Sequence, residues 1–108
     1  TDAEGRYRFI SIRPGEYPWR NHYNAWRPAH IHFSLFGQAF LTRLVTQMFF
    51  PGEPLNEADA ILMAIRDPEA RNRCVARLLP SRSSPHGSEL IYEYQLVVRG
   101  RKASPGMP

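Results

Sequence analysis

The sequence contains one cysteine, Cys74, which excludes an intramolecular disulfide. Cys74 lies in a pattern typical of a helix, where we expect a buried and unreactive thiol. A cytoplasmic location therefore fits better than an oxidising compartment. The sequence also lacks any apolar run near the roughly 20 residues that a transmembrane helix needs, so we predict no membrane span.

Charge of one sign is not concentrated anywhere except at Arg99-Gly100-Arg101-Lys102. The 108 residues include 14 Lys and Arg against 10 Asp and Glu, which gives a net charge of +4. A protein that binds nucleic acid would need a basic stripe or a known module, and the sequence shows neither. The positive charge can help attract an anionic substrate, although a solvated basic surface explains most of these arginines.

The first residues of the chain have neither an initiator Met nor the apolar stretch of a signal peptide. Residues 1–5 are polar, and a strand-like pattern begins immediately after them. We therefore expect the sequence to be a piece of a longer protein.

Alternating apolar residues predict four long strands, and turn residues separate them. The predicted strands are residues 6–13, 29–36, 40–50 and 89–99. A short helix is predicted over residues 58–65. Asp67-Pro68-Glu69 predicts the start of a second helix, because Asp caps, Pro suits the first helical position and Glu suits the positive end of the helix. This helix is expected to run to Leu78 or Leu79.

These elements predict a mostly β fold, an antiparallel β-sandwich with one or two short helices. The βαβ alternation of a parallel sheet is absent. Four strands are few for a closed sandwich, so we expect the fold to be incomplete and to need further sequence or a partner subunit. Residues 1–100 are assigned to one domain, and residues 101–108 to a loose polar tail.

His30 and His32 lie two residues apart on the most regular predicted strand, so their side chains share one face. Their imidazoles can lean together onto one metal ion, at about 2.1 Å from each nitrogen. Two histidines on a solvated face would show the same pattern, and a bare His-x-His favours that simpler arrangement. No Asp or Glu is placed to complete a site of two histidines and one carboxylate, so tyrosine is the candidate third ligand.

The residues around this histidine pair carry a specific resemblance. Two segments hold its core: Tyr17-Pro18-Trp19-Arg20 and Trp26-Arg27-Pro28-Ala29-His30-Ile31-His32-Phe33. Further segments that fit are Ile12-Arg13-Pro14-Gly15, Thr46-Gln47-Met48-Phe49-Phe50, Asp67-Pro68-Glu69-Ala70 and Leu96-Val97-Val98-Arg99-Gly100. Together they resemble the intradiol ring-cleaving dioxygenases over most of the chain. The second histidine, His32, points to the β-type subunits, which bind iron, because the α-type subunits lack it.

The resemblance implies that Tyr17, His30 and His32 bind a non-haem Fe(III). A tyrosine side chain ordinarily has a pKa of about 10, and a bound cation favours its phenolate form. The family uses a second tyrosine well upstream of the first. Tyr7 is too close in sequence to Tyr17 to take that role. We therefore expect residues 1–100 to form the C-terminal part of the catalytic domain, without the N-terminal part of the family fold.

The resemblance also implies roles outside the ligand set. Arg27 faces the substrate and steadies negative charge, and Tyr17 takes a proton from the catechol, so both are expected to be catalytic. Trp19, Arg27 and Gln47 line the substrate pocket. Trp19 can equally be a core residue, and Gln47 an ordinary amide on the surface of a sheet.

The activity implied is the cleavage of protocatechuate by O2 to 3-carboxy-cis,cis-muconate, between the two hydroxyl-bearing carbons. Catechol or hydroxyquinol is the second choice of substrate. The expected protein partner is an α subunit, with no nucleic acid and no membrane. The residues also allow a metal-free β-sandwich that binds another molecule, or a zinc site that uses His30 and His32.

Overall fold

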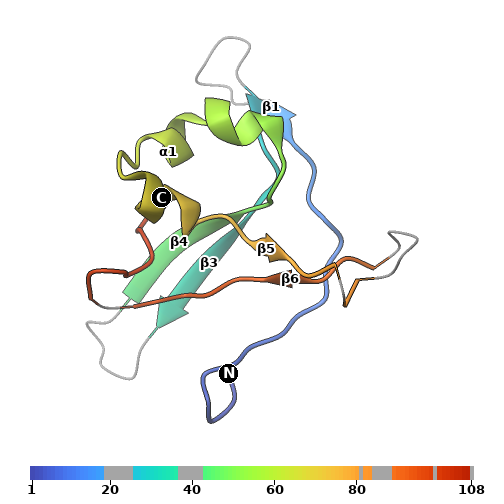
Figure 1. Cartoon of the computed structure of the whole chain (residues 1–108), viewed down its shortest axis with the longest axis vertical. Helices are drawn as coiled ribbons and strands as arrows, with labels where there is room; N and C mark the ends of the chain where they lie inside the picture. Colours follow the sequence, from blue (N-terminus) through green and yellow to red (C-terminus); the bar gives the residue numbers. More distant parts are fainter. Residues whose placement is uncertain (19–25, 37–42, 81, 84–88, 99, 108) are drawn as a thin grey trace.

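The structure is a computed structural model that describes residues 1–18, 26–36, 43–80, 82–83, 89–98 and 100–107. Within these residues, six strands form three two-stranded antiparallel sheets, and short helices lie between β4 and β5 (Figure 1). The strands are β1 (Tyr17–Pro18), β2 (Trp26–Arg27), β3 (His30–Phe36), β4 (Arg43–Phe49), β5 (Arg77–Leu78) and β6 (Tyr92–Glu93). The helices are η1 (Pro54–Ala58), α1 (Ala60–Met63) and α2 (Pro68–Asn72).

The hairpin of β3 and β4 is the longest ladder in the described part of the chain. Its register pairs His30 with Phe49 and His32 with Gln47. Paired residues on neighbouring strands point to the same face, so both histidines share a face with Gln47 and Phe49. The predicted strands at residues 29–36 and 40–50 are confirmed where the structure describes them.

Two apolar clusters lie on opposite faces of this hairpin. One contains Ala29, Met48, Phe50 and Ala76, with Ile31, Phe33, Tyr92 and Tyr94 packed against it. The other contains Phe49, Leu62, Cys74 and Met107. The end of β4 is therefore buried on both sides, and polar side chains there are shielded from water.

The helix predicted over residues 58–65 is found as α1, residues 60–63, and α2 begins where the sequence predicts but is shorter than expected. Asp67 accepts a hydrogen bond from the backbone of Glu69, as a cap should. The expected continuation to residue 78 or 79 is wrong, because α2 ends at Asn72. The backbone of Cys74 and Ala76 bonds instead to Phe49, and β5 pairs with β6. Tertiary backbone pairing thus outcompetes local helix propensity.

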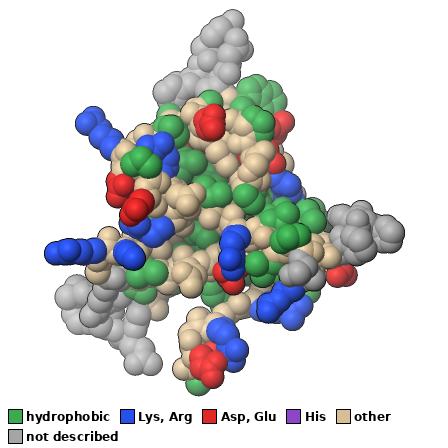
Figure 2. Space-filling view, in the orientation of Figure 1, with side chains coloured by type: hydrophobic (Ala, Val, Ile, Leu, Met, Phe, Trp, Pro, Cys, Tyr) green, Lys and Arg blue, Asp and Glu red, His purple; other side chains and the backbone are tan. Residues whose placement is uncertain are grey.

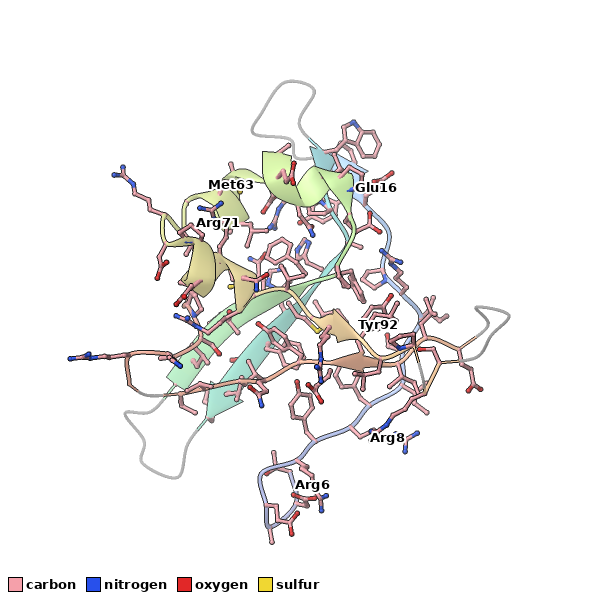
Figure 3. All side chains as sticks on the ribbon, viewed as in Figure 1. Arg6, Arg8, Glu16, Met63, Arg71 and Tyr92 are labelled. Carbon is pink, nitrogen blue, oxygen red and sulfur yellow. The ribbon has the colours of Figure 1, made fainter. Side chains whose placement is uncertain are left out.

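Arg71 connects the two helices. Its Nε donates to the carbonyl of Ile65 at 2.9 Å, and its side chain reaches the sulfur of Met63 at 3.7 Å. Figure 3 shows the side chains of Arg71, from α2, and Met63, from α1, close together. These contacts tie α2 to the end of α1.

The strand predicted at residues 6–13 is wrong, because the structure assigns this segment no strand. Tyr7 and Phe9 pack edge-on against Phe33, and the Tyr7 hydroxyl donates to the carbonyl of Tyr94 at 2.7 Å. Ile10 and Ile12 stand 88% and 91% exposed. Alternation marks a segment suited to a sheet, but a strand also needs a hydrogen-bonded partner. No backbone ladder reaches residues 6–13 within the described part of the chain.

The predicted strand at residues 89–99, of which residue 99 lies outside the described residues, is reduced to β6, which pairs with β5 alone in the part of the chain that the structure describes. The antiparallel, mostly β character is confirmed, whereas the sandwich is not, because the described strands pair only two by two. The segment expected to be a loose tail is packed: Ser104 and Met107 are buried, and Pro105 accepts a hydrogen bond from Thr46.

The described surface carries basic side chains in several separate places. On the face seen in Figure 2, Lys and Arg side chains are scattered over the surface and do not form a single stripe. Among the residues that the structure describes, no helix is both long enough and apolar enough to cross a membrane.

Candidate metal centre

The candidate site lies where the β1–β2 ladder meets the start of β3. Tyr17 pairs with Arg27 across that ladder, and His30 follows Arg27 after two buried residues, Pro28 and Ala29. The short ladder therefore brings Tyr17 next to His30, which lies thirteen positions further along the sequence. Residues of η1 lie against β2 at the same place.

Three side-chain atoms of the predicted ligands converge here. The Nε2 atoms of His30 and His32 lie 3.2 Å apart, and the Tyr17 hydroxyl lies 3.5 Å from His30 Nε2. Two nitrogen lone pairs at this separation repel each other unless a proton or a metal ion lies between them. The alternative of two histidines on a solvated face is excluded for His30, because its side chain is only 8% exposed. His32 is exposed.

The tautomer of His30 follows from its hydrogen bonds. Its Nδ1 lies 2.8 Å from the carbonyl oxygen of Pro28, which can only accept, so Nδ1 carries the proton. A neutral ring then has its lone pair on Nε2, the atom that faces Tyr17 and His32. Burial, together with nearby Arg27 and His32, holds the pKa of His30 below its usual value, so the ring is neutral at pH 7. A backbone carbonyl on the second nitrogen is a common arrangement for metal-bound histidine.

The donor distances fit a shared metal ion. Ligands at about 2.1 Å from one ion, with angles of roughly 90–110°, lie about 3.0–3.4 Å apart. The distances of 3.2 and 3.5 Å between adjacent donors fall in or beside that range. Within the described residues no group of three or more His, Cys, Asp or Glu could hold a metal ion. A three-ligand set at this site therefore depends on the phenol of Tyr17.

Arg27 is buried beside these atoms, and neighbouring side chains hold its guanidinium in place. Its Nη1 lies 3.3 Å from the Tyr17 hydroxyl and 3.2 Å from His30 Nε2. Its Nη2 donates to Gln47 Oε1 at 2.8 Å, and its Nε and Nη2 donate to the two carboxylate oxygens of Asp59 at 2.8 and 3.0 Å. Burial alone would lower the pKa of Arg27, but its hydrogen bonds to Asp59 and Tyr17 outweigh that effect and raise it. The guanidinium is therefore charged.

The structure brings together five of the six residues singled out in the sequence: Tyr17, Arg27, His30, His32 and Gln47. Trp19 lies outside the described residues. Gln47 is fully buried, so its interpretation as an amide on the sheet surface is wrong. Tyr7 packs against Phe33, whose side chain points away from the histidine face of β3.

Asp59 was missed from the sequence. A signal was present, because an aspartate directly before the apolar run Ala60-Ile61-Leu62-Met63 is typical of a helix cap. Asp59 does cap α1 by accepting from the backbone of Leu62 at 3.0 Å. Its second role, the ion pair with Arg27, joins residues 32 positions apart, and no local pattern could indicate it.

Comparison with known proteins identifies the family. Residues 1–100 match a family model described as Dioxygenase. The chain belongs to this dioxygenase family. It is 57% identical over 105 residues to the protocatechuate 3,4-dioxygenase beta chain of Burkholderia cepacia, an alignment that covers 97% of the chain and 44% of that relative. The resemblance to intradiol dioxygenases is thereby confirmed, and the chain spans less than half the length of this dioxygenase relative.

Proposed function

We propose that this chain supplies the Fe(III) site of an intradiol dioxygenase, with Tyr17, His30 and His32 as metal ligands. The observation that carries the proposal is the convergence of the Tyr17 hydroxyl with the two histidine Nε2 atoms. The proton on His30 Nδ1 supports it, because this tautomer leaves the lone pair that would bind a metal on Nε2.

The donor set suits ferric iron. A phenolate oxygen is a hard, charged donor, and neutral imidazole nitrogen is a common ligand of iron. When bound, Fe(III) would act as a Lewis acid and a template that makes a catecholate reactive toward O2. We propose that a second tyrosine, from sequence outside this chain, completes the ligand set. The sandwich predicted for the family would likewise be completed by sequence or subunits beyond these 108 residues.

The residues of the chain have distinct tasks in this proposal. Tyr17, as phenolate, accepts a proton from the incoming catechol hydroxyl. Arg27 offers Nη1 beside Tyr17 and His30, so its positive charge stabilises negative charge that builds up on the bound ring. We propose Trp19 and Gln47 as residues of the substrate pocket, and Gln47 also holds the guanidinium of Arg27 in place.

The proposed substrate is protocatechuate, opened to 3-carboxy-cis,cis-muconate, with catechol or hydroxyquinol as the alternatives. The name of the Burkholderia cepacia relative supports protocatechuate, and its designation as a beta chain supports an α subunit as partner. Because the chain covers 44% of that relative, the activity is proposed for the whole protein to which this site belongs.

A visible absorption spectrum tests the proposal. Fe(III) is added to the purified protein, and protocatechuate follows without oxygen. A broad charge-transfer band that shifts when protocatechuate is added supports an Fe(III)-tyrosinate site that binds substrate. Admission of O2 should then yield 3-carboxy-cis,cis-muconate, identified by chromatography against a standard. A protein that binds Zn²⁺ but gives no coloured Fe(III) complex would contradict the proposal, because a zinc site is colourless.

A further inference from the structure

Asp59 and Arg27 form a buried ion pair that the sequence did not predict. Their exposed fractions are 2% and 3%, and both carboxylate oxygens accept hydrogen bonds from the guanidinium. The pair joins the start of α1 to β2, at the site of the predicted metal ligands. Planar two-point contacts of this kind fix the orientation of an arginine as well as its charge.

The main effect of this ion pair is to orient Arg27 rather than to stabilise the fold. Burying two charges costs about as much desolvation energy as their attraction returns, so a buried ion pair is weak evidence for stabilisation. The orientation it imposes is specific. Asp59 occupies the edge formed by Nε and Nη2, and Gln47 occupies the rest of Nη2. Nη1 is the nitrogen that faces Tyr17 and His30.

Asp59 is itself held in place. Its Oδ2 accepts from the backbone N–H of Leu62 at 3.0 Å, and Leu62 is buried in the apolar cluster with Phe49. The carboxylate therefore has little freedom to follow a moving guanidinium. The direction of Nη1 is set through a continuous series of contacts from the packed helix α1 through Asp59 to Arg27.

We propose that Asp59 is the positioning residue that aims Nη1 of Arg27 at the Tyr17–His30 side of the site, an inference that rests on the proposed function. Asp59 acts through Arg27 and does not touch the reacting atoms. A displacement of a positioned group by about 1 Å can lower a reaction rate about 100-fold, so small errors in this carboxylate should matter. Asp59 thus becomes a determinant of substrate binding and turnover for the whole enzyme.

Two variants of the full protein test the proposal. Asp59→Asn removes the charge and one acceptor, whereas Asp59→Glu keeps the charge but shifts the carboxylate by one methylene. Asp67→Asn is the matched control, because Asp67 also caps a short helix but is exposed and is bonded to Glu69 rather than to an arginine. Thermal denaturation shows whether each variant folds.

The first readout needs no iron. NMR signals of the arginine Nε–H groups are followed in metal-free protein while their hydrogens exchange with heavy water. The signal of Arg27 is assigned by its disappearance in Arg27→Lys. We expect slow exchange in the wild type and in Asp67→Asn, because this N–H is buried and bonded. Exchange should become at least about tenfold faster in Asp59→Asn, and the signal should shift in Asp59→Glu.

The second readout uses the iron-loaded protein. Both Asp59 variants should keep the visible Fe(III) band, since the ligands are intact, yet bind protocatechuate about tenfold or more weakly and turn it over more slowly. Full recovery of affinity and of the Arg27 signal in Asp59→Glu would overturn the proposal, because charge compensation alone would then suffice. Unchanged Arg27 exchange in folded Asp59→Asn, or rapid exchange in the wild type, would also overturn it. If the wild type gives no iron band, the proposed function fails, and the exchange data still decide the positioning role.

Discussion

The Nε2 atoms of His30 and His32 lie 3.2 Å apart although one ring is buried and the other exposed. His30 is fixed by the Pro28 carbonyl on one nitrogen and stacks on Phe49, at 5.7 Å between ring centroids. His32 has its exposed position on the same face of β3. In the proposed metal site, the pair would therefore combine one preset ligand with one that water can reach.

Replacing either histidine should weaken metal binding. Loss of a residue that only hydrogen-bonds to a metal ligand lowers metal affinity about 10–100-fold. Because His30 and His32 are proposed to bind the metal directly, we expect His30→Ala and His32→Ala each to lower Fe(III) affinity by more than that. His30→Ala should also lower the melting temperature, because it empties a buried position, whereas His32→Ala should change the free energy of unfolding by no more than about 0.5 kcal/mol. Metal analysis after dialysis and thermal denaturation measure the two effects. Ser34→Ala, on the same face of β3, is the control, and full iron occupancy in His32→Ala would exclude His32 as a ligand.

Removing the phenol oxygen of Tyr17 should alter colour and substrate binding together. Tyr17→Phe keeps the ring but loses the oxygen that lies 3.5 Å from His30 Nε2. We expect part of the iron to be retained, the visible band to weaken, and catechol binding to slow, since the group that accepts the catechol proton is gone. Anaerobic stopped-flow absorbance measures the binding phases. Tyr92→Phe, at a tyrosine that packs on Phe50, should behave as the wild type; unchanged binding kinetics in Tyr17→Phe would argue against the proton transfer.

The two phenylalanines at opposite ends of the β3–β4 hairpin should differ in their contribution to stability. Phe49 is fully buried behind the histidines, so Phe49→Ala should cost about 3–5 kcal/mol in free energy of unfolding. Phe36 is 72% exposed, and Arg43 lies over its ring. Phe36→Ala should therefore lower the free energy of unfolding by less than about 1 kcal/mol. Denaturation by urea, with the slope checked for constancy, gives both values. Equal losses would mean that the core does not lie where the structure places it.

Stability should fall in alkali because of Cys74. Burial raises the pKa of its thiol from 9.0 to about 11, so the folded protein keeps this proton after the unfolded chain has released it. The unfolded state then binds fewer protons between pH 9.0 and about 11, and the free energy of unfolding decreases there, by at most about 3 kcal/mol. Cys74→Ala should lose this part of the slope in urea titrations across that range. Burial and the nearby Cys74 thiol also raise the pKa of Tyr94, so Cys74→Ala removes part of the Tyr94 contribution as well, and the difference between the two proteins contains both effects.

Local patterns in the sequence were sufficient for the strand that carries the two candidate histidine ligands, but not for β1, which carries Tyr17. Strict alternation placed His30 and His32 on one face of a strand, because side chains of an extended backbone alternate whatever the strand pairs with. The start of α2 at Asp67-Pro68 could likewise be predicted from the sequence, since a helix cap depends on neighbouring backbone groups alone. The roles of Tyr17, Arg27 and Gln47 came from the family resemblance, and the structure shows these side chains close together.

Only the tertiary structure decided which predicted segments pair into sheets, where α2 ends and how Arg27 is held. Residues 6–13 alternate as a strand should, yet they have no ladder within the described part of the chain, because hydrogen-bonded pairing depends on a partner that no local pattern specifies. The end of α2 is set by backbone bonds from Cys74 and Ala76 to Phe49, distant in the chain. The Arg27–Asp59 pair also joins distant positions, and its energy depends on burial, which exists only once the chain has folded.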